Sequence, residues 1–342
     1  MRADAIQIDG SRGEGGGQVL RTALALSLVT GRAFRIVSIR SKRKKPGLMR
    51  QHLTAVHAAS EVGNADVSGD AVGSTELSFA PRGIRPGDWH FAVGTAGSAT
   101  LVFQTVLPAL LCASGPSSLK IEGGTHNPFA PPFDFIQKAF LPLINRMGPR
   151  VEAELLRHGF FPAGGGRFTA RVRPAPKLEP LVLRERGEVK SRAARALVAR
   201  LPKTIAEREL AEIKRRLGWH GDELRVEEVS DSAGPGNALV CEVASENVIE
   251  VFTGFGEKGV SAEKVAETVA AEVGEYIESG VPVGRHLADQ LLIPLALAGR
   301  GEFVTLAPTP HTTTNIEVVG RFLDVPIRTE KTGPTSWLVR AG

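Results

Sequence analysis

The order of a glycine-rich turn, an apolar helix candidate and a strand candidate occurs three times along this sequence. A second helix candidate, with apolar residues three and four positions apart, follows each copy, and further strand candidates close it. The three copies begin at Gly13, Gly94 and Gly284. Recurrence of one order at separated positions predicts a structural unit, β-α-β-α-β-β, that is used three times. The expected fold class is therefore α/β (α+β).

The expected elements can be placed from the same patterns. Short β-rich segments lead each copy, at 5–8, 89–93 and 181–184. The glycine turn and first helix of the copies cover 13–31, 94–115 and 284–299. The second helices are expected over 48–62, 133–147 and 315–323.

The spacing of the copies locates an insertion. Gly13 and Gly94 are 81 residues apart, whereas Gly94 and Gly284 are 190 apart. Most of the excess falls in 188–280, where patterns predict helices over 206–217 and 261–277 with strands between them. Inserted domains are tolerated because their ends usually lie close together. We expect a large repeat domain from 1–187 and 281–342, interrupted by a small α/β domain.

Composition narrows the class of protein. The chain has 342 residues, 42% of them hydrophobic and 23% charged, with a formal net charge of +5. These values are ordinary for a globular protein and compatible with a polyanionic partner. Cys112 and Cys241 are the only cysteines, so a disulfide framework is excluded and a reducing compartment, the cytoplasm, is expected. The longest apolar run, 101–113, is too short to span a bilayer, so no membrane association is expected.

The glycine-rich stretch 13–17 precedes the first apolar helix. Glycines allow close backbone approach, and a helix N-terminus favours an anion, but the spacing matches no phosphate-loop motif. A flexible turn before a core helix is the alternative. Glu14 beside a bound phosphate would need a bridging cation, which points to Mg²⁺ or Mn²⁺.

Basic and polar residues gather within the first repeat, mostly after its strand at 34–39. Arginine guanidinium groups grip phosphate oxygens, so Arg21, Arg40 and Arg43 with Gln51 form a candidate phosphate site. A solvated basic surface remains the alternative. In the third repeat, Asp289 and Gln290 interrupt an apolar helix, as caps or as ligand contacts.

His311 lies in a proline-containing segment, 308–315, which we expect to be a loop before the last helix. Most loop histidines are simply exposed side chains. If His311 is catalytic, it would attack phosphorus as a neutral imidazole.

Three motifs together resemble the RNA 3′-terminal phosphate cyclase family, over essentially the whole chain. They are Gly-Glu-Gly-Gly-Gly-Gln-Val-Leu-Arg-Thr at 13–22, His-Leu-Ala-Asp-Gln-Leu at 286–291 and His-Thr-Thr-Thr-Asn at 311–315. The resemblance implies a core of three repeats like the C-terminal domain of a translation initiation factor. It also implies a small thioredoxin-like inserted domain.

The resemblance also implies a reaction, in which ATP drives conversion of an RNA 3′-phosphate to a 2′,3′-cyclic phosphodiester. His311 would form a covalent histidine–AMP, AMP would pass to the RNA 3′-phosphate, and the neighbouring 2′-OH would expel it. By motif, Glu14 looks like the residue on the metal side. The implied ATP contacts are Gln104, His286, Leu287, Ala288, Asp289 and Gln290, with the ring of His286 stacking on adenine. The implied receivers of the RNA end are Arg21, Arg40, Arg43, Gln51 and His52.

Two rival functions make different demands on the sequence. A non-cyclising relative that acts in RNA processing or ribosome assembly would lack the catalytic histidine, whereas this chain has His311. An enolpyruvyl transferase would need about twice as many repeats and forms no nucleotide adduct. The physiological RNA, any base preference and the oligomeric state are left open by the sequence.

Overall fold

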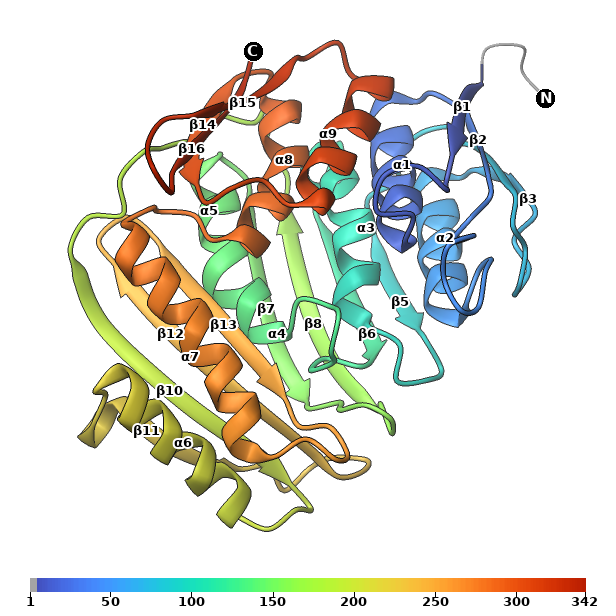
Figure 1. Ribbon diagram of the computed structural model, residues 1–342. Helices are drawn as coiled ribbons and strands as arrows, with labels where there is room; N and C mark the ends of the chain where they lie inside the picture. Colours follow the sequence, from blue (N-terminus) through green and yellow to red (C-terminus); the bar gives the residue numbers. More distant parts are fainter. Residues whose placement is uncertain (1–4) are drawn as a thin grey trace.

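The computed structural model describes residues 5–342, which form four mixed four-stranded sheets and the helices that pack on them (Figure 1). Three of the sheets share one topology. In each, the leading strand is parallel to the second strand, which is antiparallel to the last strand, and the third strand pairs at the far edge. The repetition expected from the sequence is therefore present as three sheets of identical strand order.

The first unit follows the expected order closely. It consists of β1 (Ile6–Asp9), α1 (Gly17–Thr30), β2 (Phe34–Val37), α2 (Arg50–Gly63), β3 (Asp66–Ser68) and β4 (Leu77–Ala80). Helix α1 is buried along nearly its whole length, because apolar residues and alanines occupy every face. It is therefore a core helix, as its sequence predicts.

The second unit differs from its prediction in one helix. Its elements are β5 (Asp88–Ala92), α3 (Ala99–Leu111), β6 (Ser117–Gly123), α4 (Phe133–Phe135), η1 (Ile136–Phe140), α5 (Leu141–Arg146), β7 (Arg150–Arg157) and β8 (Gly166–Arg173). The helix expected over 133–147 contains a π-helical turn, η1, followed by Pro142 near the start of α5. Proline has no backbone N–H, so regular α-helical bonding is interrupted there.

The third unit corrects the expectation for His311. Its elements are β9 (Val182–Leu183), α8 (Arg285–Ala298), β14 (Gly301–Thr305), α9 (Pro310–Phe322), β15 (Ile327–Lys331) and β16 (Trp337–Ala341). The last helix begins five residues before the expected start, so His311 lies in its first turn and not in a loop. Thr309 caps the helix by accepting a 3.1 Å hydrogen bond from the Thr312 amide, and proline suits the first helical position.

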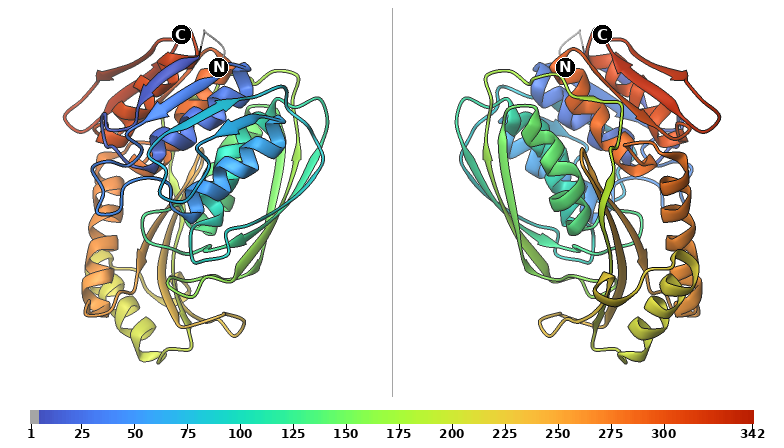
Figure 2. Two further views of the ribbon diagram at one scale, coloured as in Figure 1. Left: turned by 90° about the vertical axis from the view of Figure 1, so that its right-hand side faces the viewer. Right: turned by 90° about the vertical axis from the view of Figure 1, so that its left-hand side faces the viewer.

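The fourth sheet lies between β9 and α8 in the chain. Its elements are β10 (Val189–Ala199), α6 (Thr204–Leu217), η2 (Gly221–Glu223), β11 (Leu224–Glu228), β12 (Gly236–Ser245), β13 (Ile249–Phe255) and α7 (Ala262–Ser279). The strand order is β11-β10-β12-β13. The sequence patterns missed β10, the long strand that pairs with both β11 and β12. This inserted segment lies at one end of the molecule (Figure 2).

The two faces of the fourth sheet belong to different cores. Residues such as Ala196 and Leu239 pack with α6 and α7 in a small core, while neighbours such as Leu197 and Val240 join the large core. Alternation along a strand sends successive side chains to opposite faces. The inserted sheet is thus buried on both sides, and its second side is covered by the repeat units.

The helices of the three units pack against one another, with the sheets outside them (Figure 2). Helix α1 contacts α3 and α9, α2 contacts α3, and α8 contacts α9. Within 5–342, no helix combines the length and apolar character needed to cross a membrane. The central helices determine where the candidate site forms.

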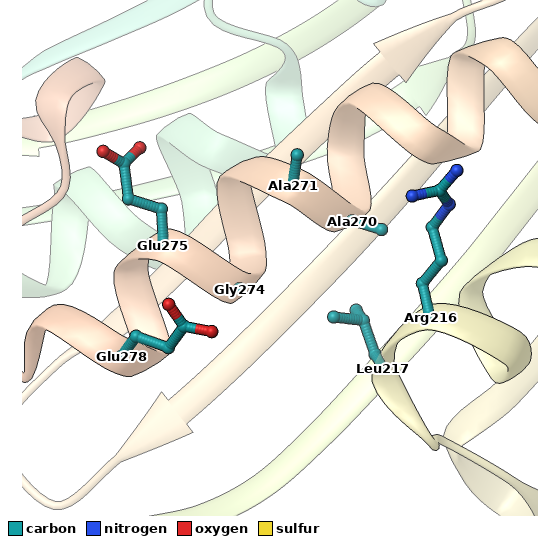
Figure 3. Close-up of a pocket in the computed structure, with 7 residues that line it drawn as sticks. All are labelled: Arg216, Leu217, Ala270, Ala271, Gly274, Glu275 and Glu278. Carbon is teal, nitrogen blue, oxygen red and sulfur yellow. The ribbon is translucent and has the colours of Figure 1, made fainter.

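A groove of about 400 Å³ lies between α6 and α7 on the inserted segment (Figure 3). Small residues, including Ala270 and Gly274, form its floor. Two of its charges already have partners: Arg216 pairs with Glu267, and Glu275 pairs with Arg285. The groove is the seam between two packed helices.

Glu250 on β13 gives the fold a pH dependence. Its carboxylate is 2% exposed and accepts a 2.5 Å hydrogen bond from the Gly284 amide at the start of α8. Burial raises the pKa of Glu250 to about 8, although hydrogen bonds from Gly284 and Val251 oppose this. The folded state therefore holds a proton that the unfolded state releases at a lower pH.

We expect the free energy of unfolding of the wild type to fall as pH rises from about 5 to about 8. In Glu250→Gln the decrease over this range should be smaller by more than about 1 kcal/mol. The amide mimics the protonated acid without titrating. Urea unfolding at several pH values measures the effect, with Glu278→Gln on the exposed face of α7 as control. Equal pH dependence in wild type and Glu250→Gln would contradict the assignment.

Candidate active site

A cavity of about 870 Å³ lies where the N-terminal turns of several central helices meet. It is lined by Gln18 and Arg21 of α1, Gln51 and His52 of α2, and His311 of α9, together with residues of α3, α8 and β13. Each helix N-terminus carries partial positive charge and free backbone N–H groups. The N-terminal turns of α1, α2 and α9 line one cavity, an arrangement that favours an anion there.

The glycine stretch builds one wall of this cavity. Gly13 and Gly15 have φ of +59° and +64°, a region that favours glycine. A Cβ at Gly17 would come within 2.4 Å of His52 Nε2 and 2.8 Å of Arg21 Nη1, and one at Gly16 within 2.3 Å of Glu14 Oε2 and 2.9 Å of Arg43 Nη2. The glycines thus make room for charged and polar side chains of the cavity.

His311 has one ring nitrogen fixed and the other available. Its Nδ1 lies 2.7 Å from Oε1 of Gln18. An amide oxygen only accepts, so Nδ1 carries the hydrogen and Nε2 keeps its lone pair. Gln18 had no role in the sequence analysis, although it directly follows the glycines at the start of α1.

The charge state of His311 follows from its surroundings. Partial burial lowers the pKa of His311, and the positive charge of Arg43 lowers it further, with smaller effects from His286 and Arg21. The imidazole is therefore neutral at neutral pH. A neutral ring with a free Nε2 is the nucleophilic form of histidine.

Glu14 lies beside this histidine. Its Oε1 is 3.9 Å from His311 Nε2, and the carboxylate forms an ion pair with Arg43. The Glu14 amide donates a 3.0 Å hydrogen bond to Thr314 Oγ1, which joins the glycine stretch to α9. Arg43, expected among the groups for the RNA end, is thus held next to the predicted metal-side residue.

Arg21 of α1 places its guanidinium group in the cavity wall. Within residues 5–342 it forms no hydrogen bond or ion pair with another side chain or the backbone. Burial, and to a smaller extent Arg40, lowers the pKa of Arg21 to about 10, so it stays charged at neutral pH. A partly buried unpaired charge is costly unless a ligand neutralises it.

The remaining residues of the basic cluster are fixed in place. Arg40 donates hydrogen bonds to the carbonyls of Lys45 (2.7 Å) and Gly47 (2.9 Å), and Gln51 Oε1 accepts one from Ser98 N (3.1 Å). Burial, followed by the charges of Arg21 and Arg40, lowers the pKa of His52 to about 3, so this ring is neutral.

On the opposite wall, Gln104 of α3 and Gln290 of α8 are hydrogen-bonded at 2.6 Å. The Oε1 of Gln104 is buried and has no hydrogen-bond partner among the residues that the structure describes. An unsatisfied buried acceptor in a cavity wall calls for a ligand donor. His286 lines the cavity as well.

Three residues of the 286–290 segment, which the sequence assigns to ATP, make other contacts in the structure. Leu287 and Ala288 are 0% and 2% exposed and pack in the large core, away from the cavity. Asp289 lines the cavity but accepts hydrogen bonds from Thr312 Oγ1 (2.5 Å) and Thr309 Oγ1 (3.5 Å). Asp289 therefore positions the first turn of α9, and with it His311.

Glu14 is the carboxylate that the sequence assigns to a metal ion, and it lines the cavity. Across the described part of the chain, no three His, Cys, Asp or Glu side chains are grouped to hold an ion. Magnesium, however, commonly binds through one or two carboxylates, water and substrate phosphates. Glu14 at a phosphate-binding cavity suits that second arrangement.

A neutral histidine, an unpaired arginine and several helix N-termini around one cavity define a candidate phosphoryl-transfer enzyme. The chain belongs to the RNA 3′-terminal phosphate cyclase family, whose model matches residues 12–329. It is 54% identical to a protein named RNA 3′-terminal phosphate cyclase from Koribacter versatilis, over 94% of this chain and 90% of that protein. Proteins of the same name from Ectopseudomonas mendocina and Ralstonia nicotianae are 52% and 53% identical, covering 96% and 95% of this chain and 95% and 93% of theirs.

Proposed function

We propose that this protein is an RNA 3′-terminal phosphate cyclase, which uses ATP to convert an RNA 3′-phosphate to a 2′,3′-cyclic phosphodiester. The observation that carries the proposal is His311, neutral and with Nε2 free, in a cavity that is also lined by Arg21, which pairs with no other group within 5–342. The relatives bearing this name at 52–54% identity support it independently.

In the first step, Nε2 of His311 attacks the α-phosphorus of ATP. A P–N bond forms, the bond to the β-phosphate oxygen breaks, and pyrophosphate leaves. Throughout this step, Gln18 Oε1 accepts a hydrogen bond from Nδ1–H of His311. This bond holds the imidazole ring and stabilises the positive charge that the ring acquires. Gln104, Gln290 and His286 are the proposed contacts of the nucleotide.

In the second step, an oxygen of the RNA 3′-phosphate attacks the adenylyl phosphorus and displaces His311. The RNA 2′-OH then attacks the activated 3′-phosphorus, AMP leaves, and the hydroxyl proton passes to solvent. This ring closure is intramolecular, so proximity supplies much of its rate. Arg21, Arg40, Gln51 and His52 are the proposed receivers of the RNA end, with Arg43 between the two substrates.

The proposed metal is Mg²⁺ or Mn²⁺, held by Glu14 together with the ATP phosphates. When bound, such an ion neutralises phosphate charge and assists pyrophosphate departure. Binding would require Glu14 to exchange its ion pair with Arg43 for the cation.

We also propose the finer assignments of fold and location. The three units correspond to the repeats of a translation initiation factor C-terminal domain, and 188–280 forms a thioredoxin-like small domain between 1–187 and 281–342. The first four residues lie outside those described. We propose a cytoplasmic location.

The alternative function is a role in RNA processing or ribosome assembly without cyclisation. That role would follow if the protein bound RNA but produced no cyclic ends.

Incubation with ATP, Mg²⁺ and a 3′-phosphorylated oligoribonucleotide tests the function. The expected products are a phosphatase-resistant cyclic end, AMP and pyrophosphate in equal amounts. Recovery of an unchanged, phosphatase-sensitive 3′ end would contradict the proposal. A matched RNA with a 3′-hydroxyl serves as control because it has no phosphate to cyclise.

The pKa of His311 predicts the pH profile of adenylation. Because the neutral ring attacks, kcat/KM for ATP should be level at neutral pH and fall only below about 6.5, the ordinary histidine value. In Arg43→Gln the midpoint should move to higher pH, since the nearby positive charge that lowers the pKa is gone. A shift to lower pH, or none, would show that Arg43 does not act on His311.

A further inference from the structure

Phe129 is a fully exposed aromatic side chain at the candidate active site. It is 100% exposed and belongs to the residues that line the cavity. Its φ is +62°, a left-handed conformation that is rare for a bulky residue and costs energy. Because the ring is fully exposed, it buries no surface that would stabilise the fold and offset the strain of the backbone at this position. A ligand that contacts the ring would account for its placement.

The loop that carries Phe129 is held on both sides. The Asn127 side-chain amide donates to the Ala96 carbonyl, and Thr100 Oγ1 donates to the Pro131 carbonyl at 2.7 Å. Asn127 is 7% exposed, so the anchor is buried. The backbone around Phe129 is therefore held by its neighbours, and the ring projects from a fixed loop.

Behind the same loop, His126 and Asp134 form a 2.8 Å hydrogen bond, and Asp134 pairs with Arg195 of the inserted sheet. Burial alone would raise the pKa of Asp134, but the hydrogen bond from His126 and the charge of Arg195 hold it well below its usual range. This buried ion network fixes the base of the loop. Phe129 thus projects from a loop whose base is fixed.

The segment 96–100, which holds the Phe129 loop, also contacts Gln51, one of the proposed receivers of the RNA end. Ser98, between the anchor positions 96 and 100, donates its amide to Gln51. Next to Gln51, Met49 lines the cavity and is 41% exposed, which adds a second apolar group to the rim. The exposed basic residues of this side, suited to RNA phosphates, are Lys42, Arg43, Lys44, Lys45 and Arg50.

We propose that the Phe129 ring is a stacking platform for a nucleobase of the RNA within its last two nucleotides. This rests on the proposed function. An aromatic face accepts any base, while the neighbouring cations hold the backbone, which is the combination found in proteins that bind single strands. Phe129 positions the RNA end so that its phosphate reaches Arg21 and the adenylated histidine.

The test measures binding of a fluorescent 3′-phosphorylated oligoribonucleotide without ATP, so it does not depend on catalysis. Phe129→Ala should raise the Kd about 10-fold, whereas Phe129→Trp should restore binding. Leu156→Ala, which removes exposed apolar surface outside the cavity, is the matched control. An unchanged Kd in Phe129→Ala would overturn the proposal.

Abasic sugars at either of the last two positions identify the stacked base. At the position whose base stacks on Phe129, the abasic sugar should weaken binding of the RNA to the wild type. Phe129→Ala should bind this abasic RNA and the intact RNA with the same Kd. Fully additive losses at both positions would contradict stacking by Phe129. The KM for ATP in RNA-free self-adenylation should stay unchanged in Phe129→Ala; a matching rise would assign the ring to adenine instead.

Failure of the proposed function would look different. If wild type binds the RNA but never cyclises it, the abasic comparison still decides the role of Phe129. If wild type cyclises the RNA and Phe129→Ala has normal Kd and KM, only the stacking proposal fails.

Discussion

His311→Asn is expected to form no covalent adduct with AMP and to lose cyclisation by a factor of about 10⁴ or more. Asparagine retains a group of similar polarity in the first turn of α9 but has no nucleophilic nitrogen. Capping by Thr309 and the contact of Asp289 with Thr312 do not involve the ring. The variant should therefore fold, and retained adenylation would show that another residue is the nucleophile.

Gln18→Ala provides a graded companion to His311→Asn. It leaves the nucleophile but removes the acceptor that holds Nδ1. We expect adenylation to continue at a reduced rate, because the ring can then rotate or change tautomer. A loss as complete as that in His311→Asn would mean that Gln18 does more than orient the ring.

Arg21→Ala is expected to reduce cyclisation of 3′-phosphorylated RNA about 100-fold while adenylation changes less than about 3-fold. The reason is that Arg21 has no partner within 5–342 and faces the side of the cavity shared with His52. Its removal should leave the resistance to urea unchanged or increase it, since an uncompensated charge is lost.

Arg12→Ala is the matched control for Arg21→Ala. Arg12 belongs to the same N-terminal region but is exposed, pairs with Asp9 and does not line the cavity. Its removal should change neither step. Equal loss of adenylation and cyclisation in Arg21→Ala would place Arg21 at ATP and contradict its assignment to the RNA end.

Much of the architecture could be predicted because the pattern is repeated. Apolar periodicity and glycine turns placed α1, α3 and α8 to within a few residues, and the elements of the fourth sheet fall where the spacing of the copies is uneven. Strand β10 was missed because its first half is exposed and charged, and only pairing with β11 and β12 makes it the middle of a sheet. Pairing partners distant in sequence leave no local signal.

In the candidate site, too, local motifs do not show how residues are arranged in space. The motifs contain most of the residues that line the cavity, but Leu287 and Ala288 of the same motif lie on the core face of α8. Prolines before His311 were interpreted as loop formers, although Pro310 occupies the first helical position, where proline is favoured. The hydrogen bond from His311 to Gln18 joins residues 293 positions apart, so only the fold reveals it.

The most direct test of the account is a two-stage labelling experiment with ATP labelled at the α-phosphate and Mg²⁺. We predict an adduct on His311, labile in acid and stable in alkali as a P–N bond should be, located by peptide mapping. Addition of unlabelled 3′-phosphorylated RNA should then discharge the label as AMP while cyclic ends appear in equal amount. No adduct, an adduct on another residue, or an adduct that RNA does not discharge would contradict the account.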